Sequence, residues 1–232
     1  MTLVPVFIFI FVLECFYFRL ANRLNIIDKP NERSSHSRIT LRGGGIVFPV
    51  SAMIFFFLYG FAYPLFFAGL ILISLISFGD DIKPLPNKIR IGVHFIAVLF
   101  MFAQWELLSQ LPFWHLIPLL IFVAGIINAF NFMDGINGMT GGYGLVVLGG
   151  LGYVNIFHTE FVDQNLINLI FISLLVFNFF NFRTKATCFA GDIGSVSLAF
   201  IIVFLLGLLI LKTSDITWLM FLAVYGIDSV LT

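Results

Sequence analysis

Four aspartates next to long apolar runs are the side chains in this sequence most able to do chemistry. Asp80 and Asp81 are adjacent in the stretch FGDD, Asp134 lies in NFMDGING, and Asp192 lies in FAGDIGS. Adjacent carboxylates repel each other and are costly near hydrocarbon unless a cation or another partner compensates their charge. Each one alone has a structural explanation, because acids mark helix ends and Asp192 could cap a helix that begins near Ser195. Only their convergence would indicate a site.

The same stretches contain arginine, asparagine and glycine, which are suited to binding phosphate. Hard carboxylate oxygens suit Mg²⁺, which usually takes one or two protein carboxylates and completes its shell with water and phosphate oxygen. Backbone N–H groups in glycine-rich stretches can approach anionic oxygen, although such stretches also serve for close helix packing. These patterns predict a Mg²⁺ and phosphate site, with Arg42, Lys88 and Arg90 as candidate phosphate partners and with glycines at Gly43–Gly45, Gly141–Gly142, Gly191 and Gly194. The lysine and the arginines could equally be topology signals.

Composition indicates that membrane-spanning helices position these residues. Of the 232 residues, 60% are hydrophobic, 17% are aromatic and only 10% are charged, and the mean hydropathy is +1.08. A soluble protein of this size cannot bury so much apolar surface, whereas a bundle in a bilayer need not. The formal net charge is zero, which gives no reason to expect nucleic-acid binding. Cys15 lies in an apolar run and Cys188 in a polar junction, so no disulfide framework is expected.

Apolar segments predict an all-α, polytopic membrane bundle that forms a single domain over residues 1–232. Nine segments are expected to span the bilayer, at 3–20, 44–59, 61–78, 91–109, 114–130, 139–157, 165–182, 193–211 and 216–231. If all nine span, the connections 21–43, 79–90, 131–138 and 183–192 lie on one face. Eleven of the 12 Lys and Arg residues fall on that side, and only Lys212 falls on the other. The positive-inside rule then makes this face cytoplasmic and the N-terminus extracytoplasmic.

Five ordered stretches resemble a known bacterial family. DKPNERSSHSRITLRGGG, FGDD, NAFNFMDGINGMTGG, FNFFNF…FAGDIGS and VYGIDSVLT are similar to the motifs of the polyprenyl-phosphate N-acetylhexosamine-1-phosphate transferases, of the glycosyltransferase family 4 type. The resemblance implies a plasma-membrane enzyme that transfers N-acetylhexosamine 1-phosphate from a UDP-sugar to undecaprenyl phosphate. It also implies Mg²⁺ (Mn²⁺ is an alternative), release of UMP, and a role at the start of a cell-envelope glycan such as O-antigen or capsule. A homodimer is compatible with it.

Matching the motifs position by position assigns roles. Asp80 and Asp81 match a pair near the lipid phosphate, Asp134 is the third candidate catalytic residue, and Asp192 matches a Mg²⁺ ligand. The expected substrate-binding residues are Arg42, Asn131, Asn137, Asn178, Phe189 and Gly191. Of these, Asn131 matches the nucleotide and metal region, and Asn178 and Phe189 match positions near the base. Asn137 stands where many members have a second aspartate, and Ile39 and Leu41 replace common prolines.

Two questions stay open at this level. The family continues beyond the DSVLT stretch into a cytoplasmic loop and a tenth helix, so we expect the chain ending at Thr232 to lack both. The chemistry could use an aspartate as a general base or as a covalent nucleophile. A transporter and an inactive membrane fragment are the alternative functions, and a transporter would need polar groups in the middle of its helices.

Overall fold

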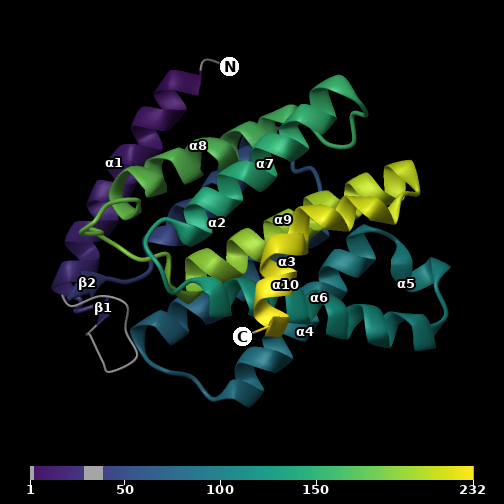
Figure 1. Cartoon of the computed structure of the whole chain (residues 1–232), viewed down its shortest axis with the longest axis horizontal. Helices are drawn as coiled ribbons and strands as arrows, with labels where there is room; N and C mark the ends of the chain where they lie inside the picture. Colours follow the sequence, from purple (N-terminus) through teal and green to yellow (C-terminus); the bar gives the residue numbers. More distant parts are fainter. Residues whose placement is uncertain (1–2, 29–38, 232) are drawn as a thin grey trace.

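The computed structural model describes residues 3–28 and 39–231, which are almost entirely helical (Figure 1). The predicted all-α class is confirmed. In chain order the elements are α1 (Leu3–Arg23), β1 (Ile27–Asp28), β2 (Thr40–Leu41), the 3₁₀ helix η1 (Gly44–Ile46), α2 (Val47–Leu58), α3 (Pro64–Ile82), α4 (Asn87–Gln104), α5 (Leu107–Gln110), α6 (Phe113–Met133), α7 (Met139–Phe157), α8 (Gln164–Asn181), α9 (Gly191–Thr213), the 3₁₀ helix η2 (Ile216–Leu222) and α10 (Ala223–Leu231).

Six helices of the described chain are long and apolar enough to cross a membrane: α1, α3, α6, α7, α8 and α9. They coincide with six of the nine predicted segments. The segments at residues 44–59 and 216–231 form shorter apolar helices. Helix α4 has 18 residues, but its first turns contain Lys88 and Arg90, which lower its mean hydropathy. The multi-pass membrane fold follows from the six long helices.

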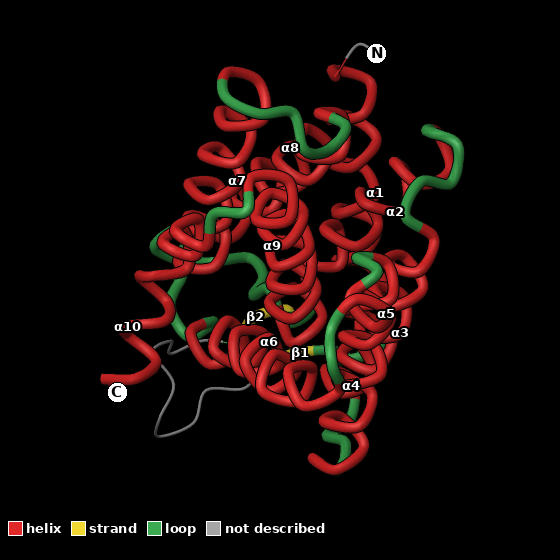
Figure 2. The backbone as a smooth tube through the Cα atoms, turned by 90° about the vertical axis from the view of Figure 1, so that its right-hand side faces the viewer, coloured by secondary structure: helices red, strands yellow, loops and turns green. Residues whose placement is uncertain are grey.

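Helix α9 is the centre of the bundle. Its sequence is apolar on every side, and such a helix is expected to be buried all round. In the view along the bundle, α9 lies in the middle with the other helices around it (Figure 2). Accordingly, 83% of its most apolar stretch is buried inside the protein. This burial fixes the position of the first turn of α9, where Asp192 lies.

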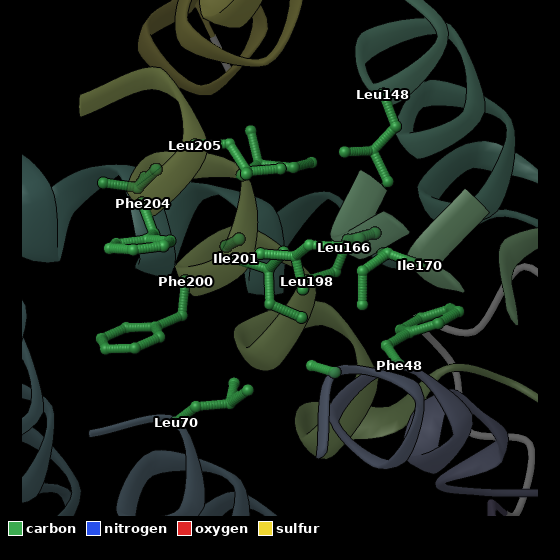
Figure 3. Close-up of a cluster of buried hydrophobic side chains, with 14 of the residues drawn as sticks. Phe48, Leu70, Leu148, Leu166, Ile170, Leu198, Phe200, Ile201, Phe204 and Leu205 are labelled. Carbon is green, nitrogen blue, oxygen red and sulfur yellow. The ribbon is translucent and has the colours of Figure 1, made fainter. Parts of the chain in front are cut away.

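The core forms where side chains of α2, α3, α7 and α8 meet α9 (Figure 3). Phe66 of α3 stacks on Phe204 of α9 with ring centroids 3.8 Å apart, and it also stacks on Phe200 at 5.6 Å. Stacked and edge-on aromatic pairs each contribute about 0.5–1.5 kcal/mol beyond the burial of their area. The core therefore holds α3 against α9, and with it the FGDD and GDIGS stretches at their ends.

Several predicted boundaries were wrong, each for a local reason. The segment predicted at residues 91–109 is divided into α4 and α5, because Glu106 has a left-handed backbone (φ 61°) that interrupts the helix. The ring of Trp105 packs at this break against Gly207 of α9, where a side chain would collide with it. The last predicted segment begins with η2 instead of an α-helix. Both cysteines are free, as expected.

The polar connections gather at one end of the bundle. The strands β1 and β2 lie at the left of Figure 1, whereas α5 lies at the right, at the opposite end of the helices. The ends of α1, α3 and α6 and the starts of α4 and α9 meet on the side of the two strands, as the ion pairs and hydrogen bonds described below require. Lys212 is in the last turn of α9, at the far end. This arrangement matches the predicted division of the loops.

Candidate functional site

The centre of the site is an ion network around Asp192, in the first turn of α9. One carboxylate oxygen, Oδ1, accepts from Arg42 Nη2 at 2.8 Å, and Oδ2 pairs with Arg90 Nη2 at 3.0 Å. Arg90 Nη1 also pairs with Asp80 Oδ2 at 3.0 Å, and Arg42 Nε pairs with Asp81 Oδ1 at 2.7 Å. Three predicted aspartates from two helices thus converge through two arginines.

The two aspartates of FGDD have different environments. The Asp81 side chain is 0% exposed, and its oxygens accept the backbone N–H groups of Asp192 (2.8 Å) and Ile193 (3.0 Å). These amides are free donors at the start of α9, so a carboxylate there also favours the positive end of the helix dipole. The acceptor that caps α9 is therefore Asp81, from α3. The alternative interpretation of Asp192 as a cap is wrong, since the helix begins at Gly191.

Asp80 faces the ion network instead. Its Oδ1 accepts from the backbone N–H of Leu85 at 2.7 Å, which ties the α3–α4 connection to the helix end. Its carboxylate lies near that of Asp192, because the Arg90 guanidinium pairs with both. Two neighbouring carboxylates require a shared proton or a cation between them. The geometry thus favours chemistry at Asp80 and a positioning role for Asp81, whose predicted catalytic role stays untested.

Arg42 is fixed by backbone hydrogen bonds. Its N–H donates to Ile26 O at 3.1 Å, and its carbonyl accepts from the hydroxyl of Tyr17 at 2.6 Å. Burial of the guanidinium lowers the pKa of Arg42, but attraction to Asp81 and Asp192 outweighs this effect, so its pKa lies above the ordinary value. Arg42 is therefore a permanent cation at this site.

The glycine triplet after Arg42 serves close backbone packing. Gly44 N–H donates to Phe189 O at 2.8 Å, and Gly45 N–H donates to Ala190 O at 3.0 Å. Gly45 also lies directly against the backbone of Gly194, with no room for a side chain. The N–H groups of Gly44 and Gly45 are therefore used within the protein, and the predicted approach to anionic oxygen does not apply to them. The triplet places Arg42 beside the start of α9.

Gly45→Ala is expected to destabilise the protein by about 1–3 kcal/mol, because the new methyl group would collide with the backbone of Gly194. The matched control is Gly142→Ala in α7, where an added Cβ meets nothing within 4 Å. That change is expected to stabilise its helix by about 0.5–1 kcal/mol. Thermal unfolding in detergent tests the pair, and equal melting temperatures would contradict the packing role of Gly45.

A polar pocket of about 220 Å³ lies beside the network. Six of the ten predicted site residues line it, together with Asp28 of β1: Arg42, Asn131, Asp134, Phe189, Gly191 and Asp192. Gly191 needs to be glycine, because its φ is 72° and a Cβ would lie 2.6 Å from Asp81 Oδ2. The tertiary structure thus brings residues as far apart in the sequence as Asp28 and Asp192 to one cavity.

Helix α6 supplies two of the pocket residues, from its last turn and its end. Asn131 Oδ1 accepts from Ser195 Oγ at 2.6 Å, which ties α6 to α9. Asp134 Oδ1 accepts from Thr140 Oγ1 at 2.7 Å, at the start of α7. Burial raises the pKa of Asp134 to about 6, although the hydrogen bond from Thr140 opposes this shift. Asp134 is thus protonated more easily near neutral pH than an ordinary aspartate.

Two predicted substrate-binding residues do not line the pocket. The Asn178 amide donates to Leu174 O within its own helix at 2.9 Å and packs against Gly141 of α7. Asn137 donates to Arg183 O at 3.0 Å and so ties together two connections. Both residues support neighbouring segments in this structure, and their contact with a nucleotide stays a prediction. The part of the first connection at residues 29–38 lies outside the described residues.

Sequence reasoning missed several residues that support the site. Asn181 accepts from Gly138 N–H at 2.7 Å and donates to Cys188 O at 2.8 Å, which joins the end of α8 to the α6–α7 and α8–α9 connections. Glu14 and Tyr17 were also missed. Both are buried in α1, and the Glu14 carboxyl lies 3.8 Å from Cys188 Sγ. Their spacing of three residues, which places them on one helix face inside an apolar run, was the available signal.

Comparison with known proteins identifies the family. Residues 63–210 match the model of glycosyl transferase family 4. A probable undecaprenyl-phosphate N-acetylglucosaminyl 1-phosphate transferase of Bacillus subtilis is 26% identical over 197 residues, which are 78% of this chain and 55% of that protein. An undecaprenyl-phosphate alpha-N-acetylglucosaminyl 1-phosphate transferase of Escherichia coli K12 is 25% identical over 224 residues, 88% of this chain and 60% of that protein. A transferase of the same name from Thermotoga maritima is 32% identical over 132 residues, which are 54% of this chain and 42% of that protein.

The chain spans only 55% and 60% of the first two relatives. The matched region nevertheless begins with α3 and extends into α9, so it contains most of the ion network and of the pocket. Arg42 and Asp28 lie before it. Because the family model covers well over half of the chain, the resemblance predicted from the motifs is confirmed, and the protein belongs to glycosyl transferase family 4.

Proposed function

We propose that this protein transfers an N-acetylhexosamine 1-phosphate from a UDP-sugar to undecaprenyl phosphate and releases UMP. The observation that carries the proposal is the pocket of arginine, asparagine and carboxylate side chains at one end of an apolar bundle. Such a site suits two substrates. One carries an anionic diphosphate, and the other is a phosphate attached to a long apolar chain. The relatives in Bacillus subtilis and Escherichia coli are named for an undecaprenyl-phosphate acceptor.

The residues present also fit Mg²⁺. Among the described residues no group of three or more His, Cys, Asp or Glu side chains is arranged to hold a metal. Mg²⁺, however, often takes one or two carboxylates and leaves the other positions to water and phosphate. The carboxylates of Asp80 and Asp192, which Arg90 brings together, meet that requirement. Asp192 would hold the ion, Asp80 would flank it, and Mn²⁺ could replace it. When bound, the ion would neutralise charge on the diphosphate.

The protein side chains then have separate tasks in phosphoryl transfer, which needs mainly positioning and charge neutralisation. Arg42 and Arg90 donate to phosphate oxygens, and Asn131, Asn137, Asn178 and Phe189 are the candidates for holding the nucleotide. An oxygen of the lipid phosphate attacks the β-phosphorus, the bond from the β-phosphorus to the bridging oxygen breaks, and UMP leaves with that electron pair. Asp80 accepts the proton of the lipid phosphate or orients it. A covalent aspartyl intermediate is the competing mechanism.

Transfer assays test this function directly. Membranes containing the chain expressed from its whole reading frame are supplied with undecaprenyl phosphate, Mg²⁺ and each of several UDP-N-acetylhexosamines. We expect UMP and a lipid-linked sugar phosphate in equal amounts. If no donor reacts while the Escherichia coli relative is active in the same membranes, the proposed activity is wrong. Among the described residues, buried Asp80, Asp81 and Asp192 lie at helix ends, whereas buried Glu14 lies in the middle of α1 with its carboxyl 3.8 Å from Cys188 Sγ. One buried acid in mid-helix is not the path of polar groups that a transporter would need.

We also propose that the site faces the cytoplasm of a bacterial cell, at the plasma membrane, where such a product would begin a cell-envelope glycan. Single cysteines are introduced into a Cys15→Ala/Cys188→Ala background at the exposed positions Asn87, Ile136 and Lys185, with exposed Lys212 at the far end as the control. An impermeant thiol reagent added to intact cells is expected to label only the cysteine at 212. Labelling at any of the other three positions would reverse the topology.

A further inference from the structure

Arg90 pairs with both of the carboxylates that would hold or flank a divalent cation. Its Nη1 lies 3.0 Å from Asp80 Oδ2, and its Nη2 lies 3.0 Å from Asp192 Oδ2. The guanidinium therefore bridges an aspartate of α3 and an aspartate of α9. All three side chains are mostly buried, with 24%, 8% and 11% of the Arg90, Asp80 and Asp192 side chains exposed. The attraction is thus only weakly screened by solvent.

A guanidinium and a divalent ion compete for the same carboxylate oxygens. Mg²⁺ binds about 2.0–2.1 Å from a carboxylate oxygen. Its two positive charges would repel an arginine guanidinium that pairs with the same carboxylate. With Arg42 on Oδ1 and Arg90 on Oδ2, both oxygens of Asp192 already have a cationic partner. A metal ion can bind Asp192 with its full affinity only after one arginine has left the carboxylate.

The two arginines differ in how firmly they are held. Arg42 also pairs with Asp81, which is fully buried and caps α9, and its backbone is tied at both N–H and C=O. Arg90 has no comparable anchor for its side chain: its two ion-pair partners among the described residues are Asp80 and Asp192 themselves. It lies in the first turn of α4, where Pro86 precedes the helix and no side chain caps it. Arg90 is therefore the arginine that can move.

We propose that Arg90 is an exchangeable counter-ion that occupies the metal position and moves to the substrate diphosphate when the metal binds. This rests on the proposed function, and specifically on a divalent ion at Asp192. In the empty site the guanidinium keeps Asp80 and Asp192 together despite their repulsion. In the occupied site the same guanidinium donates to the anionic oxygens that arrive with the nucleotide. Arg90 thereby couples nucleotide binding to metal binding. The metal displaces Arg90 from the two aspartates and frees it for the diphosphate, and the diphosphate draws Arg90 away from the carboxylates that would bind the metal.

Such coupling is reciprocal, since the factor by which the nucleotide tightens metal binding equals the factor by which the metal tightens nucleotide binding. Direct contact between metal and diphosphate gives part of this factor, and release of Arg90 gives the rest. Removing the Arg90 charge should therefore have opposite effects on the two ligands. Metal binding without nucleotide should become tighter, and the gain caused by the nucleotide should become smaller. A residue that merely supports the fold would weaken both.

The test measures Mn²⁺ binding to the purified full-length protein in detergent by electron paramagnetic resonance, with and without UDP, so no turnover is involved. Arg90→Gln is expected to bind Mn²⁺ about 10-fold more tightly than the wild type without UDP, within the usual range of coupling factors. The tightening caused by UDP should shrink by a similar factor. Arg90→Lys keeps the charge but cannot bridge two carboxylates in the same way, so its Mn²⁺ affinity should lie between the two.

Lys83→Gln is the matched control, because it removes one positive charge from the connection that leads into α4. Lys83 is exposed and makes no ion pair with a described residue, so its removal should change Mn²⁺ affinity by less than about twofold. Weaker or unchanged Mn²⁺ binding in Arg90→Gln, with normal thermal unfolding, would overturn the exchange and leave the proposed function standing. If Arg90→Gln does not fold, an unchanged affinity in Arg90→Lys would overturn it. Absence of Mn²⁺ binding to the wild type would refute both the exchange and the metal site.

Discussion

Replacing Asp192 with asparagine is expected to lower kcat for sugar-phosphate transfer by at least about 10³-fold while the protein stays folded, since lost electrostatic stabilisation of a transition state is of this order. Asparagine is nearly isosteric, can still accept from Arg42 and can turn its NH₂ group toward Asp80, and each arginine keeps a second carboxylate partner. The start of α9 should therefore keep its geometry. What asparagine lacks is the negative charge that pairs with the two arginines and that would hold a divalent ion. The loss should therefore appear in turnover, not in folding.

The matched control is Asp215→Asn at the far end of the bundle. Asp215 caps η2 by accepting from Thr217 N–H at 2.9 Å, and asparagine caps a helix about equally well. Its transfer rate should match the wild type. Mn²⁺ binding and thermal unfolding are measured on both variants. If Asp192→Asn turns over near the wild-type rate at low Mg²⁺, the metal role of Asp192 is wrong.

The second large effect separates the two neighbouring aspartates. Asp81→Asn is expected to destabilise the protein by about 3–5 kcal/mol, the usual loss when one partner of a buried ion pair is removed. The asparagine NH₂ group would face either the backbone N–H of Ile193 or Arg42, both of which are donors. Thermal unfolding in detergent measures this effect.

Asp80→Asn is expected to behave in the opposite way. Both oxygens of Asp80 also face donors, Leu85 N–H and Arg90 Nη1, but the asparagine NH₂ group could turn toward the nearby carboxylate of Asp192. The loss of stability should therefore be smaller than for Asp81→Asn, whereas kcat should fall by about 10²–10⁴-fold if Asp80 is a general base. The KM for the UDP-sugar should change less than kcat, because Asp80 does not line the pocket. If both variants keep the wild-type melting temperature and more than about a tenth of its kcat, the pair has neither role.

Particular residues show how far the sequence could lead. Apolar length and the distribution of Lys and Arg determine a helical membrane bundle, because hydrocarbon accepts only segments that satisfy their own backbone hydrogen bonds. The same reasoning indicated that Asp80, Asp134 and Asp192 would lie at helix ends on one face. The motif FGDD could not reveal that its two aspartates differ. Adjacent residues of a helix point in different directions, and only the packing of α3 against α9 decides which one meets the free N–H groups.

The tertiary structure also decided the roles of the glycines, the amides and Arg90. A Gly-Gly-Gly triplet can bind an anion or admit a neighbouring backbone, and the nearby start of α9 selects the second at Gly44 and Gly45. The Asn178 amide turns toward its own helix and not into the pocket. The local sequence fixes which groups are polar and where each helix can end. Distances between residues that are far apart along the chain, such as Arg42 and Asp192, depend on how the apolar faces pack around α9.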